Sequence, residues 1–158
     1  MKIPLTSLWS IEEGAAGKIA AMIHAAAGID DRRGEPLISQ TAGNIGIVHV
    51  TGVMTKGEEE AWWFGGTSTM QATRAVAAFA DAPGTKALVI NFDSPGGTVD
   101  GLAEFGDAIF EAKKKKKVYA QVSGTTASAA YYAASQADRI FAGRMDMIGS
   151  IGTRLMLY

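Results

Sequence analysis

The chain of 158 residues contains no cysteine. This absence excludes disulfide bonds, zinc–thiolate sites, iron–sulfur ligation and a cysteine nucleophile. The formal net charge is only −1, so bulk electrostatics favour neither nucleic acid nor an anionic membrane surface as a partner. Histidine is also scarce, with only His24 and His49 available as the imidazole base that a Ser-His-Asp triad requires.

Long hydrophobic runs are missing as well. No segment approaches the ~20 apolar residues that a membrane-spanning helix needs. The apolar stretch 3–8 is shorter than that of a signal peptide and is followed by acidic Glu12 and Glu13. Apolar residues nevertheless make up 47% of the chain and charged residues 20%, which is ordinary for a folded domain with a core. We expect a soluble protein with no membrane span, in a reducing, cytoplasmic compartment.

The chain divides into two regions near residue 44. Ser10-Ile11-Glu12-Glu13 has the form of a capping box, which predicts an alanine-rich helix extending to about Ala27. Residues 28–44 are polar and contain glycine, as is typical of a connector. We therefore expect residues 1–44 to be an appended N-terminal helix with its connector, and residues 45–158 to form the main domain.

Strand and helix patterns alternate through the main domain. β-branched and apolar runs predict strands over 45–53, 86–92, 118–122 and 139–142. Helical spacing predicts a helix over 67–82, a second with Val99, Leu102, Gly106, Ile109 and Phe110 on one face, and a third over 128–135. Residues 54–67 are expected to be a loop, and the lysine run 113–117 a solvated helix end. The alternation predicts an α/β fold with a mainly parallel sheet and right-handed crossovers.

The segment Asp93-Ser94-Pro95-Gly96-Gly97 follows the second expected strand. Pro95 fixes one backbone angle, while Gly96 and Gly97 can adopt conformations closed to other residues. A tight turn here could present backbone N–H groups at a helix start, an arrangement suited to an oxyanion. A plain strand-to-helix turn is the alternative interpretation.

Ser128 stands at the start of the third expected helix, between Ala127 and Ala129. Its small neighbours allow another backbone to approach closely, and a helix N-terminus stabilises developing negative charge. The alternative is an ordinary serine N-cap. An oxyanion-type turn followed about thirty residues later by a helix-initiating serine is the layout that acyl transfer requires.

A serine nucleophile also needs a base. His49 lies between Val48 and Val50, so its side chain points to the opposite sheet face and is interpreted as structural. No Gly-x-Ser-x-Gly elbow surrounds Ser128, which excludes an α/β-hydrolase. A Ser–Lys dyad stays open, because a desolvated lysine can act as a base near neutral pH. The candidate lysines are Lys56, Lys86 and the run 113–117.

Three motifs in order resemble the signal peptide peptidase A family of serine peptidases, in particular its phage branch of head-maturation (capsid assembly) proteases. They are the segment 93–97, the segment 126–135 followed by Ala137-Asp138-Arg139-Ile140, and Ile148-Gly149-Ser150-Ile151-Gly152. Leu8-Trp9 and Gly65-Gly66-Thr67-Ser68-Thr69 look more like the phage branch than the membrane-anchored enzymes.

The resemblance implies a ClpP/crotonase-like fold and peptide-bond hydrolysis by a Ser–Lys dyad. Ser128 would be the nucleophile, and the amides of Gly97, Gly96 and Ala129 would bind the oxyanion. No metal and no cofactor are implied. The implied partners are a polypeptide substrate, further copies of the chain in a homo-oligomer, and phage capsid or scaffold proteins, with no nucleic acid. The implied location is the host cytoplasm or the prohead.

In this family the general-base lysine follows the motif at 148–152, so we expect it beyond Tyr158 and expect the peptidase core 45–158 to be incomplete at its C-terminus. Because a positioned base contributes ~10²–10⁴-fold to the rate, a chain lacking it should be feebly active. A ClpP-type Ser-His-Asp peptidase is an alternative, although residues 129–158 contain no histidine. A catalytically silent assembly module that packs through Trp62, Trp63 and Phe64 is another, and a crotonase-like acyl-CoA enzyme is a third.

Overall fold

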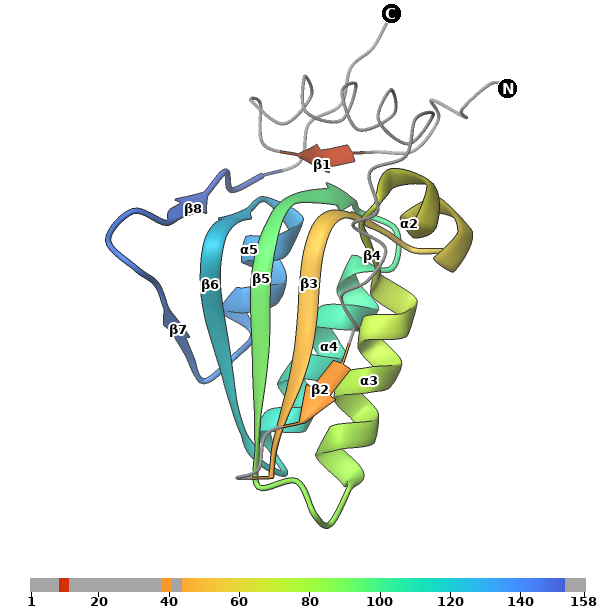
Figure 1. Ribbon diagram of the computed structural model, residues 1–158. Helices are drawn as coiled ribbons and strands as arrows, with labels where there is room; N and C mark the ends of the chain where they lie inside the picture. The colour runs from red at the N-terminus through yellow and green to blue at the C-terminus, as the bar shows by residue number, and fades with distance from the viewer. Residues whose placement is uncertain (1–8, 12–37, 41–43, 153–158) are drawn as a thin grey trace, which may run out of the picture.

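The computed structural model describes residues 9–11, 38–40 and 44–152 (Figure 1). The strands are β1 (Trp9–Ile11), β2 (Ile38–Gln40), β3 (Ile45–Thr55), β4 (Thr67–Ser68), β5 (Ala87–Thr98), β6 (Lys117–Ala127), β7 (Arg139–Phe141) and β8 (Met147–Gly149). The helices are α2 (Glu58–Phe64), α3 (Thr69–Asp81), α4 (Leu102–Lys113) and α5 (Ala129–Ser135).

The main sheet has the order β2-β3-β5-β6-β7. Strands β3, β5, β6 and β7 are parallel, whereas β2 pairs antiparallel with β3. Helices α3, α4 and α5 connect successive parallel strands and lie on one face of the sheet (Figure 1). This architecture confirms the expected α/β fold with a mainly parallel sheet and crossover helices.

The core lies between this face of the sheet and the three helices. Every second residue of the three long parallel strands is buried, because successive side chains of a strand point to opposite faces. The buried apolar residues at these alternating positions in the first part of each strand are Val48, Val50, Leu88, Ile90, Phe92, Val118, Ala120 and Val122. His49 is half-buried between Val48 and Val50, as the alternation predicts.

Two expectations near the start of the chain need correction. Ser10 and Ile11 belong to strand β1 and do not open a helix, while the remainder of the expected helix, residues 12–27, lies outside the described residues. The expected loop 54–67 contains helix α2. Three glutamates in its first turn complement the helix dipole, and Gly65 at φ 60° ends it in the left-handed conformation that glycine adopts readily.

Two further differences concern helix boundaries and faces. Thr67 and Ser68 pair with β3 as a short strand, so α3 begins only at Thr69. In α4 the buried aromatic residue is Phe105, whereas Phe110 is 47% exposed. The ammonium groups of Lys113 and Lys114 lie 5.1 and 5.3 Å from the centre of the Phe110 ring. Cation–π contact therefore covers a ring that the helical pattern assigned to the core.

Asp138 joins the start of β7 to the start of β6. Its Oδ2 accepts a hydrogen bond from the Val118 amide at 2.8 Å, and Lys117 Nζ lies 3.6 Å from Oδ1. The hydrogen bond from Val118, assisted by the charge of Lys117, lowers the pKa of the Asp138 carboxyl. The ionised carboxylate is therefore the form that the folded state favours.

Replacing Asp138 with asparagine should lower the free energy of unfolding at pH 7 and leave less difference at pH 3. A carboxyl with a lowered folded-state pKa contributes stability above its unfolded pKa, and that contribution is lost as pH falls through the folded pKa. Urea denaturation of both proteins from pH 7 to pH 3 measures this difference. A difference that stays constant over the whole range would contradict the assignment.

No helix within the described residues is long and apolar enough to cross a membrane.

Candidate active site

The glycine segment after the second expected strand belongs to strand β5 and does not form a tight turn at a helix start, although Gly96 has a φ of 100° that only glycine adopts readily. Strand β5 continues through Pro95, Gly96 and Gly97, and α4 begins only at Leu102. The expectation that these amides lie at a helix start is therefore wrong, because they lie along a strand. A Cβ on Gly97 would stand 1.8 Å from the carbonyl oxygen of Met54. The two backbones are thus closer than any side chain at this position would allow.

Ser94 holds this stretch in place. Its buried hydroxyl donates to the Gly52 carbonyl at 2.6 Å and accepts from the Gly96 amide at 3.1 Å. Gly52 has a φ of +63° and lies where the register of β3 against β5 shifts. One side chain therefore ties a bulge in β3 to the backbone just before Gly97. The sequence did not predict this role for Ser94. The feature that could have indicated it is a small hydroxyl residue directly before the Pro-Gly-Gly segment.

Replacing Ser94 with alanine should destabilise the fold by about 1–3 kcal/mol, because it leaves the Gly52 carbonyl and Gly96 amide without their buried partner. Chemical denaturation measures this loss. Ser123→Ala is the matched control, since Ser123 is exposed on neighbouring β6 and its hydroxyl contacts Asn91 Oδ1 at 3.0 Å. Equal losses for the two variants would contradict the bridging role of Ser94.

Ser128 occupies the junction between β6, which ends at Ala127, and α5, which begins at Ala129. Its backbone angles are φ 57° and ψ −118°, in a region that non-glycine residues rarely adopt. Such a conformation costs on the order of 1–3 kcal/mol and concentrates at functional sites. The Ser128 side chain makes no helix-capping hydrogen bond, so the alternative of an ordinary N-cap loses its support.

A sharp strand–serine–helix turn of this kind is the backbone form of a nucleophile elbow. The sequence lacks the Gly-x-Ser-x-Gly pattern that usually signals one, yet the backbone takes the shape with alanines on either side. Ala127, Ala129, Ala130 and Ala133 are all buried around the turn. Their small side chains allow α5 to pack closely against β5 and β6.

The third motif supports the Ser128 turn directly. Strand β8 pairs in parallel with β6, placing Ile148 opposite Thr126. The Ser128 amide donates to the Gly149 carbonyl at 2.8 Å. This hydrogen bond occupies the amide of Ser128 itself. The neighbouring amide of Ala129 is therefore the candidate donor to an oxyanion. Strand β8 was not expected from the sequence, and its short apolar run is exposed at Met147 and Ile148.

Contacts between β5 and β6 bring the two expected segments together. Ser94 of β5 lies opposite Thr126 of β6 in the sheet. Gly96 follows Ser94 by two residues, and Ser128 follows Thr126 by two residues. One residue earlier, Asp93 Oδ1 accepts a hydrogen bond from the Thr125 amide at 3.0 Å. The glycine pair, still within β5, and the serine just after β6 therefore lie at the same carboxyl end of the sheet, where sites form in parallel α/β sheets. Among the described residues, the Thr126 hydroxyl is buried there without a hydrogen-bond partner.

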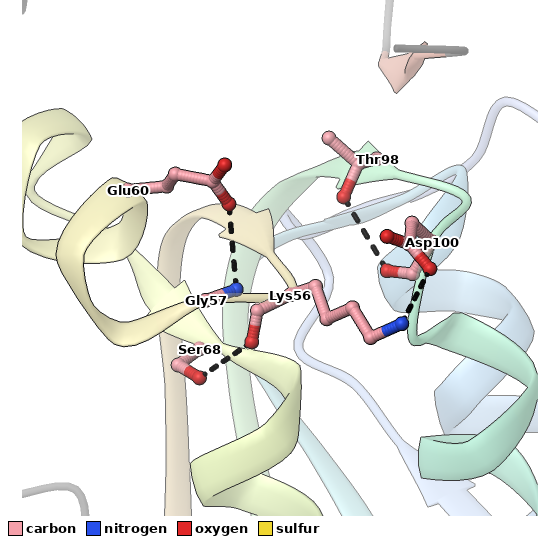
Figure 2. Close-up of polar contacts among 6 residues, drawn as sticks. All are labelled: Lys56, Gly57, Glu60, Ser68, Thr98 and Asp100. Atoms are coloured by element: carbon pink, nitrogen blue, oxygen red, sulfur yellow. Dashed lines mark hydrogen bonds and ion pairs between the residues drawn. The ribbon is translucent and has the colours of Figure 1, made fainter.

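None of the candidate lysines is placed to act as a base for Ser128. Lys86 and the run 113–117 lie at the start of β5 and β6, at the end of the sheet opposite to Ser128. Strand β6 has 11 residues, so at about 3.3 Å per residue its two ends are roughly 30 Å apart. Lys56 follows β3 at the correct end, but its Nζ lies 2.9 Å from Asp100 Oδ1 (Figure 2). This hydrogen bond and the negative charge of Asp100 raise the pKa of Lys56, so its amine is protonated at neutral pH.

No group of three or more histidine, cysteine, aspartate or glutamate side chains in the described part of the chain could hold a metal ion. The arrangement consists of a strained serine, a glycine-lined strand and main-chain amides. Those parts can provide a nucleophile and hydrogen-bond donors for a developing oxyanion.

Comparison with known proteins supports the peptidase resemblance found in the sequence. Residues 111–158 match the model of Peptidase family S49. Protease 4 of Salmonella typhi is 30% identical over 118 residues, covering 72% of this chain and 18% of that protein. The head-tail preconnector protein GP5 of Enterobacteria phage P21 is 33% identical over 70 residues, covering 44% of this chain and 14% of that protein. The chain thus spans less than a fifth of the length of these two relatives.

Solved structures agree on the fold. The structure of an enoyl-CoA hydratase/isomerase family member superposes with a TM-score of 0.55 and 16% identity. The superposition covers 71% of this chain and 48% of that protein. The enoyl-CoA hydratase from Bacillus halodurans superposes on 72% of this chain and 52% of its own, with a TM-score of 0.54 and 10% identity. At such low identity the likeness concerns the crotonase-like fold alone. The resemblance drawn from the three motifs is confirmed at the level of similarity: residues 111–158 match the model of Peptidase family S49, and the chain is similar to Protease 4 and to the phage protein GP5.

Proposed function

We propose that this chain carries the nucleophile and the oxyanion-binding groups of a serine endopeptidase, with Ser128 as the nucleophile. The observation that carries the proposal is the backbone of Ser128 at φ 57° and ψ −118°, held at the end of β6 beside the glycine stretch of β5. A structural serine gains nothing from this strained conformation, whereas a nucleophile gains a fixed direction for its Oγ. Ser128 is only 5% exposed, so the surrounding packing holds that direction.

The chemistry follows from the positions of the groups. Ser128 Oγ attacks the scissile carbonyl carbon while a base removes the hydroxyl proton. The amides of Gly97 and Ala129 donate hydrogen bonds to the carbonyl oxygen as it becomes an oxyanion. The Gly96 amide, also expected from the sequence to be a donor, is already engaged by Ser94 Oγ at 3.1 Å. The proton then passes to the leaving amine as the C–N bond breaks. Water hydrolyses the acyl-enzyme ester, which releases the second product and restores the serine.

We propose a lysine as the general base, in a Ser–Lys dyad, because the family resemblance carries that arrangement. Lys56 is unsuited to the role in this structure, since the carboxylate of Asp100 stabilises its protonated form. The family pattern places the base lysine after the motif at 148–152. A Ser-His-Asp triad finds no support in the described residues after Ser128, because residues 129–152 contain no histidine.

A role in phage prohead maturation is the biological setting that we propose. The similarity to the head-tail preconnector protein GP5 of phage P21 supports this setting, together with the Leu8-Trp9 and 65–69 segments that resemble the phage branch. The substrate would be a polypeptide, with capsid or scaffold proteins as partners and further copies of the chain in an oligomer. The site would act in the host cytoplasm or within the prohead.

Labelling with a fluorophosphonate probe tests the nucleophile. In a longer chain that includes the base lysine, the folded protein should be modified at Ser128, located by peptide mapping, because an activated serine reacts with the phosphorus centre. Heat-denatured protein is the control and should not be labelled. Modification spread over several serines, or equal labelling of denatured protein, would contradict the assignment.

A second candidate function is a catalytically silent assembly module. The observation that favours it is the exposed indole pair on α2, where Trp62 is 56% and Trp63 44% exposed and their rings meet edge to face at 5.3 Å. Phe64 is half-buried and belongs less to this surface. Size-exclusion chromatography combined with the labelling assay separates the two functions, because an assembly module would form oligomers without any reactive Ser128.

A further inference from the structure

The edge of β5 that carries the proposed oxyanion amides changes its neighbour at Ser94. One edge of β5 pairs with β3 from Ala87 to Asp93 and, after a register shift, again at Gly96 and Gly97, which lie opposite Val53 and Met54. The opposite edge pairs with β6 only as far as Ser94, opposite Thr126. Beyond that point β6 ends and the chain turns through Ser128 into α5. The edge of β5 nearest to Ser128 is therefore left open by β6.

Strand β1 fills this opening. It pairs antiparallel with β5, with Trp9 opposite Thr98, Ser10 opposite Gly97 and Ile11 opposite Gly96. Because β3 already holds one edge of Gly96 and Gly97, β1 must take the other, which is the edge that β6 leaves. Figure 1 shows β1 lying across the end of the sheet where β5 finishes.

A peptide substrate needs the same edge. For its scissile carbonyl to reach the Gly97 amide, an extended peptide must run alongside 96–98, where main-chain hydrogen bonds can hold it as an added strand. A strand edge accepts one neighbour at a time, since each main-chain N–H and C=O points to a single side. The main-chain groups of 96–98 that pair with β1 are therefore not simultaneously available to a substrate.

We propose that the β5 edge at 96–98 is the docking edge for an extended peptide, and that β1 occupies it as an internal competitor that a substrate must displace. This inference rests on the proposed peptidase function and adds a means of controlling access to the site. A tethered strand has an effective concentration on the order of millimolar, so it outcompetes a more dilute free peptide of similar affinity. The chain would thereby protect its own site from short, weakly binding peptides.

Proline substitutions in β1 test the proposal. Neighbouring strand residues alternate in the direction of their N–H groups, so Ser10→Pro/Ile11→Pro removes a ladder hydrogen bond in either register. The matched control is Ser39→Pro/Gln40→Pro in β2, which is also a three-residue antiparallel strand but pairs with β3 at the opposite end of the sheet. Hydrogen exchange at 96–98 should accelerate in the β1 variant and stay unchanged in the β2 variant.

Access for a peptide is measured in a Ser128→Cys background, where the introduced thiol is the only one because the chain has no cysteine. The probes are a tetra-alanine chloromethyl ketone, which must bind as a strand, and iodoacetamide, which need not. The ratio of their alkylation rates should rise about tenfold in the β1 variant, on the order expected when a tethered competitor is released. The ratio should stay unchanged in the β2 variant.

Each outcome is decisive. Unchanged exchange at 96–98 in the β1 variant would show that β1 does not hold this edge, which overturns the proposal. Faster exchange with an unchanged alkylation ratio would show that β1 is structural and does not compete with peptides, which also overturns it. Absence of fluorophosphonate labelling at Ser128 would show separately that the proposed peptidase function is wrong. The two tests are independent because alkylation of the introduced thiol requires no catalytic base.

Discussion

In a longer chain that includes the base lysine, replacing Ser128 with alanine should lower the rate of peptide hydrolysis by at least about a thousandfold while leaving the fold intact. The variant loses the only oxygen that the proposed mechanism uses for attack, and no hydroxyl remains at the turn where β6 meets α5. The backbone strain at φ 57° persists, since alanine disfavours that region as serine does. Cleavage of a denatured protein substrate measures the rate, and thermal unfolding checks the fold.

Ser135→Ala is the matched control for this prediction. Ser135 ends the same helix, is exposed, and donates only to the nearby Tyr132 carbonyl at 2.7 Å. Its loss should leave hydrolysis unchanged. Full proteolysis by the Ser128→Ala variant would exclude Ser128 as the nucleophile, whatever the Ser135 variant does.

Replacing Gly97 with alanine should destabilise the fold by about 3–5 kcal/mol, which is an unusually large effect for one methyl group. The new Cβ would stand 1.8 Å from the Met54 carbonyl oxygen, and the atom it meets is backbone, which cannot rotate away. Strands β3 and β5 must therefore separate locally. The same shift moves the Gly97 amide, so hydrolysis should fall even at temperatures where the variant is folded.

Gly84→Ala provides the control, since no atom lies within 4 Å of a Cβ at position 84 and its φ is not in the left-handed region. Its stability should be unchanged or slightly raised, because alanine restricts the unfolded chain. Urea denaturation at matched conditions compares the two variants. A Gly97→Ala protein as stable as the Gly84→Ala protein would contradict the close backbone approach.

Much of the fold could be read from local patterns. The runs at 45–53, 86–92 and 118–122 are apolar and β-branched, and each forms the first part of a parallel strand. Their alternation with helices was sufficient to predict the sheet type, since parallel strands require crossover connections. Boundaries were less predictable, because β5 and β6 both continue past the point where their apolar runs end.

The continuation of β5 shows why the rest could not be predicted. Pro95, Gly96 and Gly97 favour a turn in isolation, yet β3 supplies partners for both Gly96 and Gly97. Pairing with a neighbouring strand outweighs local propensity when the partner's backbone can approach closely, as the missing side chain of Gly97 permits. The same limit applies to Ser94, whose two hydrogen-bond partners come from residues that only folding brings near.

The α/β class and the three motifs that resemble the signal peptide peptidase A family are evident from the amino-acid sequence alone. These features are periodic or contiguous, so they can be recognised without knowing which segments meet. The strained turn at Ser128, the bridge from Ser94 to β3 and the pairing of β1 with the edge of β5 emerge only in the folded chain. Each of these depends on contacts between residues distant in the chain, and the packing of the sheet selects those contacts.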